Sequence, residues 1–78
     1  MENTHKRSVE TVMRLGISTI RSARYTNCGN VVIYTASEPT KSTKISVTNA
    51  LRRENGVRRV TWKNSRSGHR VFGTSVLR

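Results

Sequence analysis

The N-terminal third of the chain carries apolar residues at helical spacing. At about 100° per residue, one stripe contains Val9, Val12, Met13, Gly16, Ile17, Ile20 and Ala23. The pattern predicts an amphipathic helix from residue 9 to residue 24. Ser8 is a suitable N-cap, because its hydroxyl can accept a hydrogen bond from a free amide of the first turn. The polar residues 1–7 are expected to form a flexible N-terminus.

Basic residues form a second stripe on this predicted helix. Arg7, Arg14 and Arg21 recur at every second turn, so their side chains lie on the side away from the apolar stripe. The apolar face could then pack against the rest of the chain or support a homodimer. The arginine face would meet an anion.

A strand and a loop are predicted in the middle of the chain. Residues 25–30 contain turn-forming Asn and Gly, and residues 31–35 are β-branched and aromatic, which is typical of a strand. The unbroken apolar run predicts that both faces of this strand are covered. Residues 37–44 include the single proline and lack large apolar side chains, which indicates a loop.

A second helix is predicted from Ile45 to Asn55, with Ser46 as its N-cap. Gly56 follows it and can adopt the left-handed conformation that ends helices. Its apolar face is short and consists of Val47, Ala50 and Leu51.

The C-terminal segment predicts a hairpin. Residues 57–63 and 69–77 have strand composition, and residues 64–68 have turn chemistry. A register that pairs Trp62 with Arg70 places the large apolar side chains on one packing face. These side chains are Val60, Trp62 and Phe72.

The order helix, strand, helix, strand, strand indicates an α+β fold. We expect a small three-stranded sheet, antiparallel or mixed, packed by two helices. The length of 78 residues allows one domain, which we assign to residues 8–78.

The charge balance narrows the class of partner. Fifteen Lys and Arg face four acids, giving a net charge of +11. Eleven of the cations are Arg, whose guanidinium makes forked hydrogen bonds to phosphates and guanine edges. A field of this sign attracts polyanions, and solubility alone would need a smaller surplus. The composition therefore indicates a nucleic-acid-binding protein.

The positive charge is concentrated at the C-terminal end of the chain. Eight of the fifteen cations lie in residues 52–78, against one Glu. Asn49, on the exposed helix face, can pair with adenine, although it could equally be an ordinary surface residue. Arg66 lies in the predicted turn, where it can reach phosphate or the minor groove. The candidate nucleic-acid-binding residues are Asn49, Arg52, Arg53, Arg58, Arg59, Lys63, Arg66 and Arg70.

Residues 45–76 resemble winged-helix DNA-binding domains. The segment ISVTNALRRENGVRRVTWKNSRSGHRVFGTSV supplies a helix, a glycine stop and a basic hairpin. The resemblance implies a winged-helix-like variant of the fold, with a recognition helix in the major groove of duplex DNA and a wing beside it. The segment covers under half of the chain. Residues 37–44 supply no apolar face for the helix that precedes the recognition helix in that family.

Catalytic chemistry is not indicated. The four Glu are scattered among basic residues and there is no Asp, so a two-metal nuclease site is not expected. Two His and one Cys do not form a zinc motif. The five glycines are dispersed and form no nucleotide-binding loop. We expect a protein that is not an enzyme and needs no metal or cofactor.

The sequence gives only weak signals for the cellular location of the protein. The single cysteine, Cys28, does not require an oxidising compartment. No apolar run approaches the length of a membrane span, and the N-terminus lacks a signal-peptide pattern. We expect no membrane association and a cytoplasmic or nucleoid location.

The leading hypothesis is a small regulator or accessory factor that binds duplex DNA, encoded by a phage or mobile element. Duplex is favoured over single strands because we assign Trp62 and Phe72 to the core, which leaves only Tyr25 and Tyr34 for base stacking. RNA binding is one alternative. Another is an inhibitor or adaptor that docks on an acidic surface of a host protein.

Overall fold

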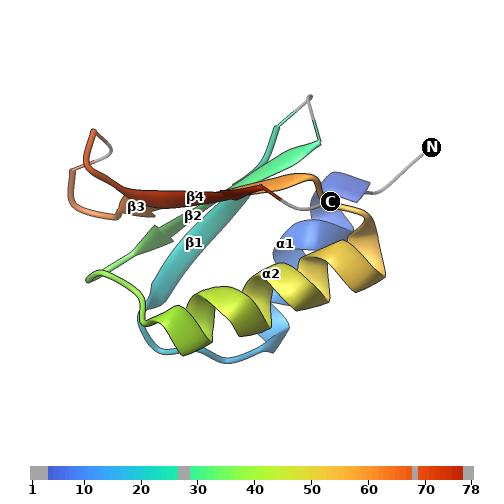
Figure 1. Ribbon diagram of the computed structural model, residues 1–78, viewed down its shortest axis with the longest axis horizontal. Coiled ribbons are helices and arrows are strands. Elements are labelled where there is room, and N and C mark those ends of the chain that lie inside the picture. The colour runs from blue at the N-terminus through green and yellow to red at the C-terminus, as the bar shows by residue number, and fades with distance from the viewer. Residues whose placement is uncertain (1–3, 27–28, 68, 77–78) are drawn as a thin grey trace.

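The computed structural model describes residues 4–26, 29–67 and 69–76. These residues form two helices and four strands (Figure 1). Cys28 and Gly68, in the predicted turns, and Leu77, at the end of the last predicted strand, lie outside the described residues. The elements are α1 Thr4–Arg14, β1 Ile20–Tyr25, β2 Asn30–Thr35, α2 Lys41–Asn55, β3 Arg59–Asn64 and β4 Val71–Val76.

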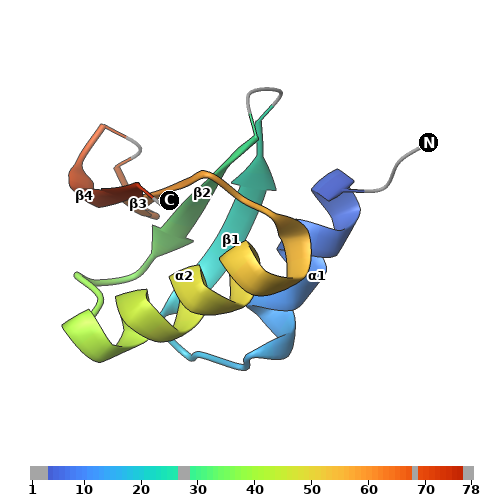
Figure 2. The same ribbon diagram turned by 45° about the vertical axis from the view of Figure 1, so that its right-hand side comes forward.

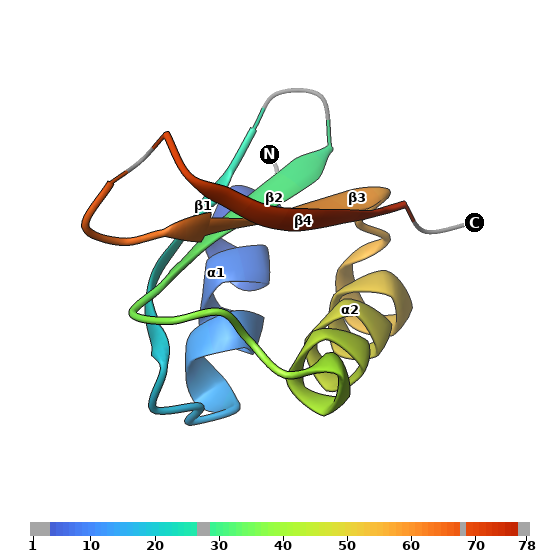
Figure 3. The same ribbon diagram turned by 60° about the vertical axis from the view of Figure 1, so that its left-hand side comes forward.

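The four strands form one mixed sheet in the order β1-β2-β3-β4. β1 pairs with β2 and β3 with β4 in antiparallel fashion, whereas β2 and β3 are parallel. The parallel pair needs a crossover connection, and α2 provides it. Figures 2 and 3 show both helices on the same face of the sheet. The α+β class is confirmed, but the prediction of three strands is wrong, because the sheet has four.

The additional strand is formed by residues that the prediction places at the C-terminal end of the first helix, which continues too far in the prediction. α1 ends at Arg14, and Gly16 follows with φ +65°. This left-handed conformation ends the helix. β1 then occupies Ile20–Tyr25, so the three-arginine helix stripe is wrong: Arg21 lies on β1. Ser8 is not the N-cap, because it lies inside α1 and is fully buried.

The second helix begins earlier than predicted. Thr40 is its N-cap and accepts a hydrogen bond from the amide of Thr43 at 3.1 Å, so Ser46 does not cap it. The first turn of α2, residues 41–44, is entirely polar, with two side chains exposed and two half-buried. It therefore lacks the apolar spacing that marks a helix. The predicted stop is confirmed: Gly56 has φ +64° and its amide donates to the carbonyl of Arg52.

The core lies between the helices and one face of the sheet. Its fully buried side chains include Trp62, and Phe72 packs against the cluster, half-buried. The predicted hairpin register is wrong, because Trp62 pairs with Gly73 instead of Arg70. The loop is longer than expected: the Asn64 amide donates to the Arg70 carbonyl at 2.9 Å and closes it. The remaining fully buried apolar residues are Val12, Val31, Ile33, Val47, Leu51 and Val60.

Candidate nucleic-acid interface

One face of the sheet is not covered by either helix (Figures 1 and 3). Along β2, the buried side chains of Val31, Ile33 and Thr35 alternate with half-buried Asn30, Val32 and Tyr34. Alternation of this kind places the second set on the opposite, uncovered face. The prediction that β2 is covered on both faces is therefore wrong. Two apolar side chains of β2, Val32 and Tyr34, belong to an open surface.

Strand register shows which residues share the uncovered face. Directly paired residues point to the same side of a sheet. Tyr34 pairs with Ser22 on β1 and with Lys63 on β3. Val32 pairs in the same way with Arg24 and Thr61. Further along, Asn30 pairs with Arg59, and β4 contributes Val71 and Thr74 at the edge. We call this surface the basic sheet face: Ser22, Arg24, Asn30, Val32, Tyr34, Arg59, Thr61, Lys63, Val71 and Thr74.

Three cations frame the half-buried side chains of Val32 and Tyr34. Arg24 and Arg59 are exposed and Lys63 is half-buried. Strands lie about 4.8 Å apart and residues about 3.3 Å apart along a strand, so the Cα atoms of Arg59 and Lys63 are about 13 Å apart. Arg24 lies two strands away and is offset by two residues from each of them, so its Cα atom is about 12 Å from both. The spacing leaves room for an anionic chain across the face.

Within residues 4–26, 29–67 and 69–76, no carboxylate pairs with these cations. The four strands contain no acidic residue. Among the described residues the one ion pair joins Arg14 to Glu54 at 2.6 Å, on the helix side of the molecule. Three like charges on one face repel each other and gain nothing from a local partner. The arrangement favours an anionic ligand.

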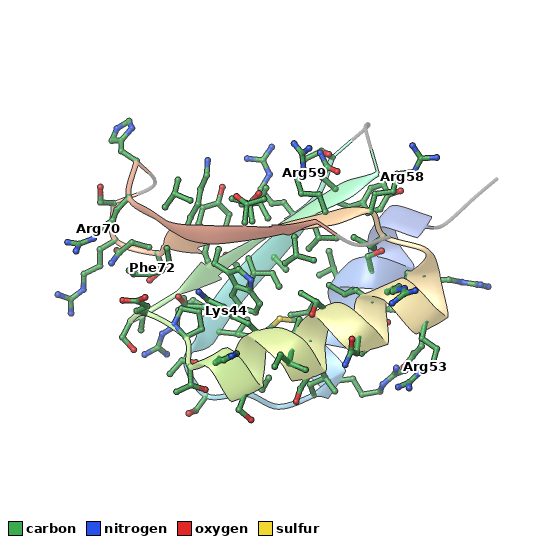
Figure 4. All side chains as sticks on the ribbon, viewed as in Figure 1. Lys44, Arg53, Arg58, Arg59, Arg70 and Phe72 are labelled. Carbon is green, nitrogen blue, oxygen red and sulfur yellow. The ribbon has the colours of Figure 1, made fainter. Side chains whose placement is uncertain are left out.

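Further predicted site residues extend this surface at both ends. Figure 4 shows Arg58 and Arg59 on the side of the sheet away from the helices. Arg58 precedes β3, and its amide donates to the Gly29 carbonyl at 3.1 Å. Arg66 is exposed in the β3–β4 loop, where its amide donates to Asn64 Oδ1 at 2.8 Å. Arg70 lies at the same loop end of the sheet (Figure 4).

The other predicted residues lie on a different surface. Asn49, Arg52 and Arg53 are exposed on α2 and line a surface hollow of about 360 Å³. Arg53 lies on the side of α2 away from the sheet (Figure 4). The eight predicted residues therefore do not form one continuous patch. Five of them belong to the sheet and its hairpin, and three belong to the outer face of α2.

The α1 arginines have a separate, mixed-charge environment. Arg7 and Arg14 line a hollow of about 300 Å³ between the two helices, together with Glu10 and Glu54. Arg14 is held by the ion pair with Glu54. A ligand that carries only negative charge would meet carboxylates here, so this hollow is a poor site for a polyanion.

Arg24 and Tyr34 are the functional candidates that the sequence prediction left out of its site. The apolar spacing places Arg24 at the end of a predicted helix, and the assignment of Trp62 and Phe72 to the core leaves Tyr34 only as a stacking candidate. The useful signal was Gly16, which ends α1 and leaves residues 20–25 free to pair with β2.

Within the part of the chain that the structure describes, His, Cys, Asp and Glu form no group able to hold a metal ion. No helix in the same residues is long and apolar enough to cross a membrane. Comparisons with family models, curated proteins and solved structures found no match.

Proposed function

We propose that this chain binds nucleic acid through the basic sheet face. The observation that carries the proposal is an open sheet surface with three cations, a half-buried tyrosine and no acidic residue in any strand. Lys and Arg on such a surface bind phosphates and release the counterions condensed on them, which supplies most of the affinity. The role of a small regulator or accessory factor stays a prediction.

The outer face of α2 is the weaker candidate. Arg52 and Arg53 lie in its last turn, where positive charge interacts favourably with the free carbonyl groups of the helix end. These two arginines therefore already have a structural reason to be there. The cations of the basic sheet face have no comparable partner among the residues that the structure describes, so a ligand explains them better.

The test compares two variants that remove the same amount of charge from different surfaces. The sheet triple is Arg24→Gln, Arg59→Gln and Lys63→Gln. The helix triple is Arg7→Gln, Arg52→Gln and Arg53→Gln. Fluorescence anisotropy with labelled oligonucleotides measures the Kd of both against the unmodified chain.

We expect the sheet triple to lose most of its affinity and the helix triple to keep it within about threefold, since the remaining effect is long-range and screened. Equal losses would show that binding follows net charge and would contradict the proposed site. Binding by neither the unmodified chain nor any variant would favour the alternative of an acidic protein partner.

A further inference from the structure

Tyr34 occupies an interior position on the basic sheet face. β2 lies between β1 and β3, and the register places Tyr34 beside Ser22 on one side and Lys63 on the other. Its side chain is half-buried on the uncovered face, whereas the other strand aromatics, Tyr25, Trp62 and Phe72, belong to or pack against the core. The structure thus leaves an aromatic side chain on a surface with no helix over it.

The neighbours of Tyr34 fit a nucleotide on either side of its ring. Directly paired residues have Cβ atoms about 5 Å apart, and diagonal ones about 7–8 Å. Lys63 is the direct neighbour, and Arg24 is diagonal, because it pairs with Val32. A base stacked on the ring would place its flanking phosphates within reach of these two long cationic side chains.

The width of the sheet argues against a duplex on the same face. The major groove of B-DNA is about 12 Å wide and admits a helix or a two-stranded ribbon. Four strands about 4.8 Å apart span about 14 Å between the outer backbones before side chains are added. Tyr34, on an interior strand, therefore cannot reach base edges in a groove. It can reach a base that is already unpaired.

We propose that the ligand of the basic sheet face is a single-stranded nucleic acid, with one unpaired base stacked on Tyr34. This inference rests on the proposed function and specifies its substrate class. It reverses the preference for duplex DNA suggested by the small number of aromatic residues. One aromatic at an interior position is enough to stack one base of any type, and the cations supply the rest of the affinity.

The test uses three replacements of Tyr34 that distinguish the contribution of the aromatic ring from those of apolar bulk and of the hydroxyl. Tyr34→Phe keeps the ring, Tyr34→Leu keeps apolar bulk, and Tyr34→Ala removes both. The probes are oligo(dT), oligo(U) and a mixed-sequence DNA duplex of equal length, at about 0.15 M salt. Thermal unfolding of each variant confirms that it is folded.

We expect the unmodified chain to bind either single strand more tightly than the duplex. Tyr34→Ala should weaken single-strand binding about 5- to 150-fold, the range for loss of one stacked base. Tyr34→Leu should lose nearly as much, Tyr34→Phe should stay within twofold, and duplex binding should be unchanged. Preference for DNA or for RNA single strands fits equally well, because both supply an unpaired base.

Two results overturn the inference. One is tighter binding to the duplex than to both single strands, and the other is an equal Kd for the alanine and phenylalanine variants. If the sheet triple still abolishes binding in either case, the proposed function stands and the stacking at Tyr34 fails. If the sheet triple binds normally, the proposed function fails as well.

Discussion

The loss expected for the sheet triple can be worked out from the surface itself. Four cations lie within reach of one ligand: Arg24, Arg59 and Lys63 on the basic sheet face, and Arg58 beside its end. Each phosphate contact on a single strand contributes about −0.7 to the slope of log K against log salt. The unmodified chain should therefore show a slope of about −2.8, and the sheet triple about −0.7.

The same slopes give the change in affinity at one salt concentration. Removing three contacts costs about 2.1 in slope. With equal affinity of the two chains at about 1 M salt, where phosphate contacts contribute nothing, this difference corresponds to about a 50-fold weaker Kd at about 0.15 M salt. Anisotropy titrations at four salt concentrations, from about 0.05 to 0.3 M, measure both quantities independently. A sheet triple whose Kd weakens while its slope stays near −2.8 would refute the reasoning. Such a result would mean that the three side chains act through the fold and not through phosphate.

Two further predictions test the helix boundaries that differ from the sequence-based expectation. Gly16→Ala should lower the free energy of unfolding by about 1–2 kcal/mol, because Gly16 has φ +65° and alanine is strained there. Urea unfolding measures this loss. No loss of stability, together with more helix by circular dichroism, would show that α1 continues past Arg14. Thr40→Ala should cost about 1 kcal/mol through loss of the bond to the Thr43 amide. Ser46→Ala should be neutral or slightly stabilising, because Ser46 is exposed inside α2; the opposite ranking would restore Ser46 as the cap.

The main fold error was the missed first strand, and its cause is physical. Ile20 and Ala23 fit a helical stripe with Ile17, so the apolar spacing predicted one long helix. In the structure Ile20 is buried and Ala23 and Tyr25 pack against the core, all from β1. The apolar spacing fits both one long helix and a helix followed by a strand. The left-handed conformation of Gly16 distinguishes them, because it ends the helix before β1.

Strong local signals were sufficient elsewhere. The glycine stop after α2, the strand in residues 31–35 and the burial of Trp62 were all predicted and are confirmed. The start of α2 was missed because its first turn contains only polar residues and so resembles a loop. The hairpin register was missed because it depends on the length of a loop that Asn64 closes.

The candidate site was partly predictable from charge. Arg59 and Lys63 were both predicted and lie on the basic sheet face. Arg52 and Arg53 are close to them in sequence, but they lie in the last turn of α2 and line a hollow on that helix, so they do not belong to the basic sheet face. Arg24 and Tyr34 join the face only once β1 pairs with β2, which no local pattern specifies.

Mapping the bound surface residue by residue tests the central claim most directly. Amide chemical shifts of the isotope-labelled chain, recorded by NMR during a titration with oligo(dT), report which backbone sites meet the ligand. We expect the largest changes at the amides of Arg24, Val32, Tyr34 and Thr61, with little change at Asn49 on α2. Changes concentrated on the outer face of α2, with β1–β3 unaffected, would contradict it.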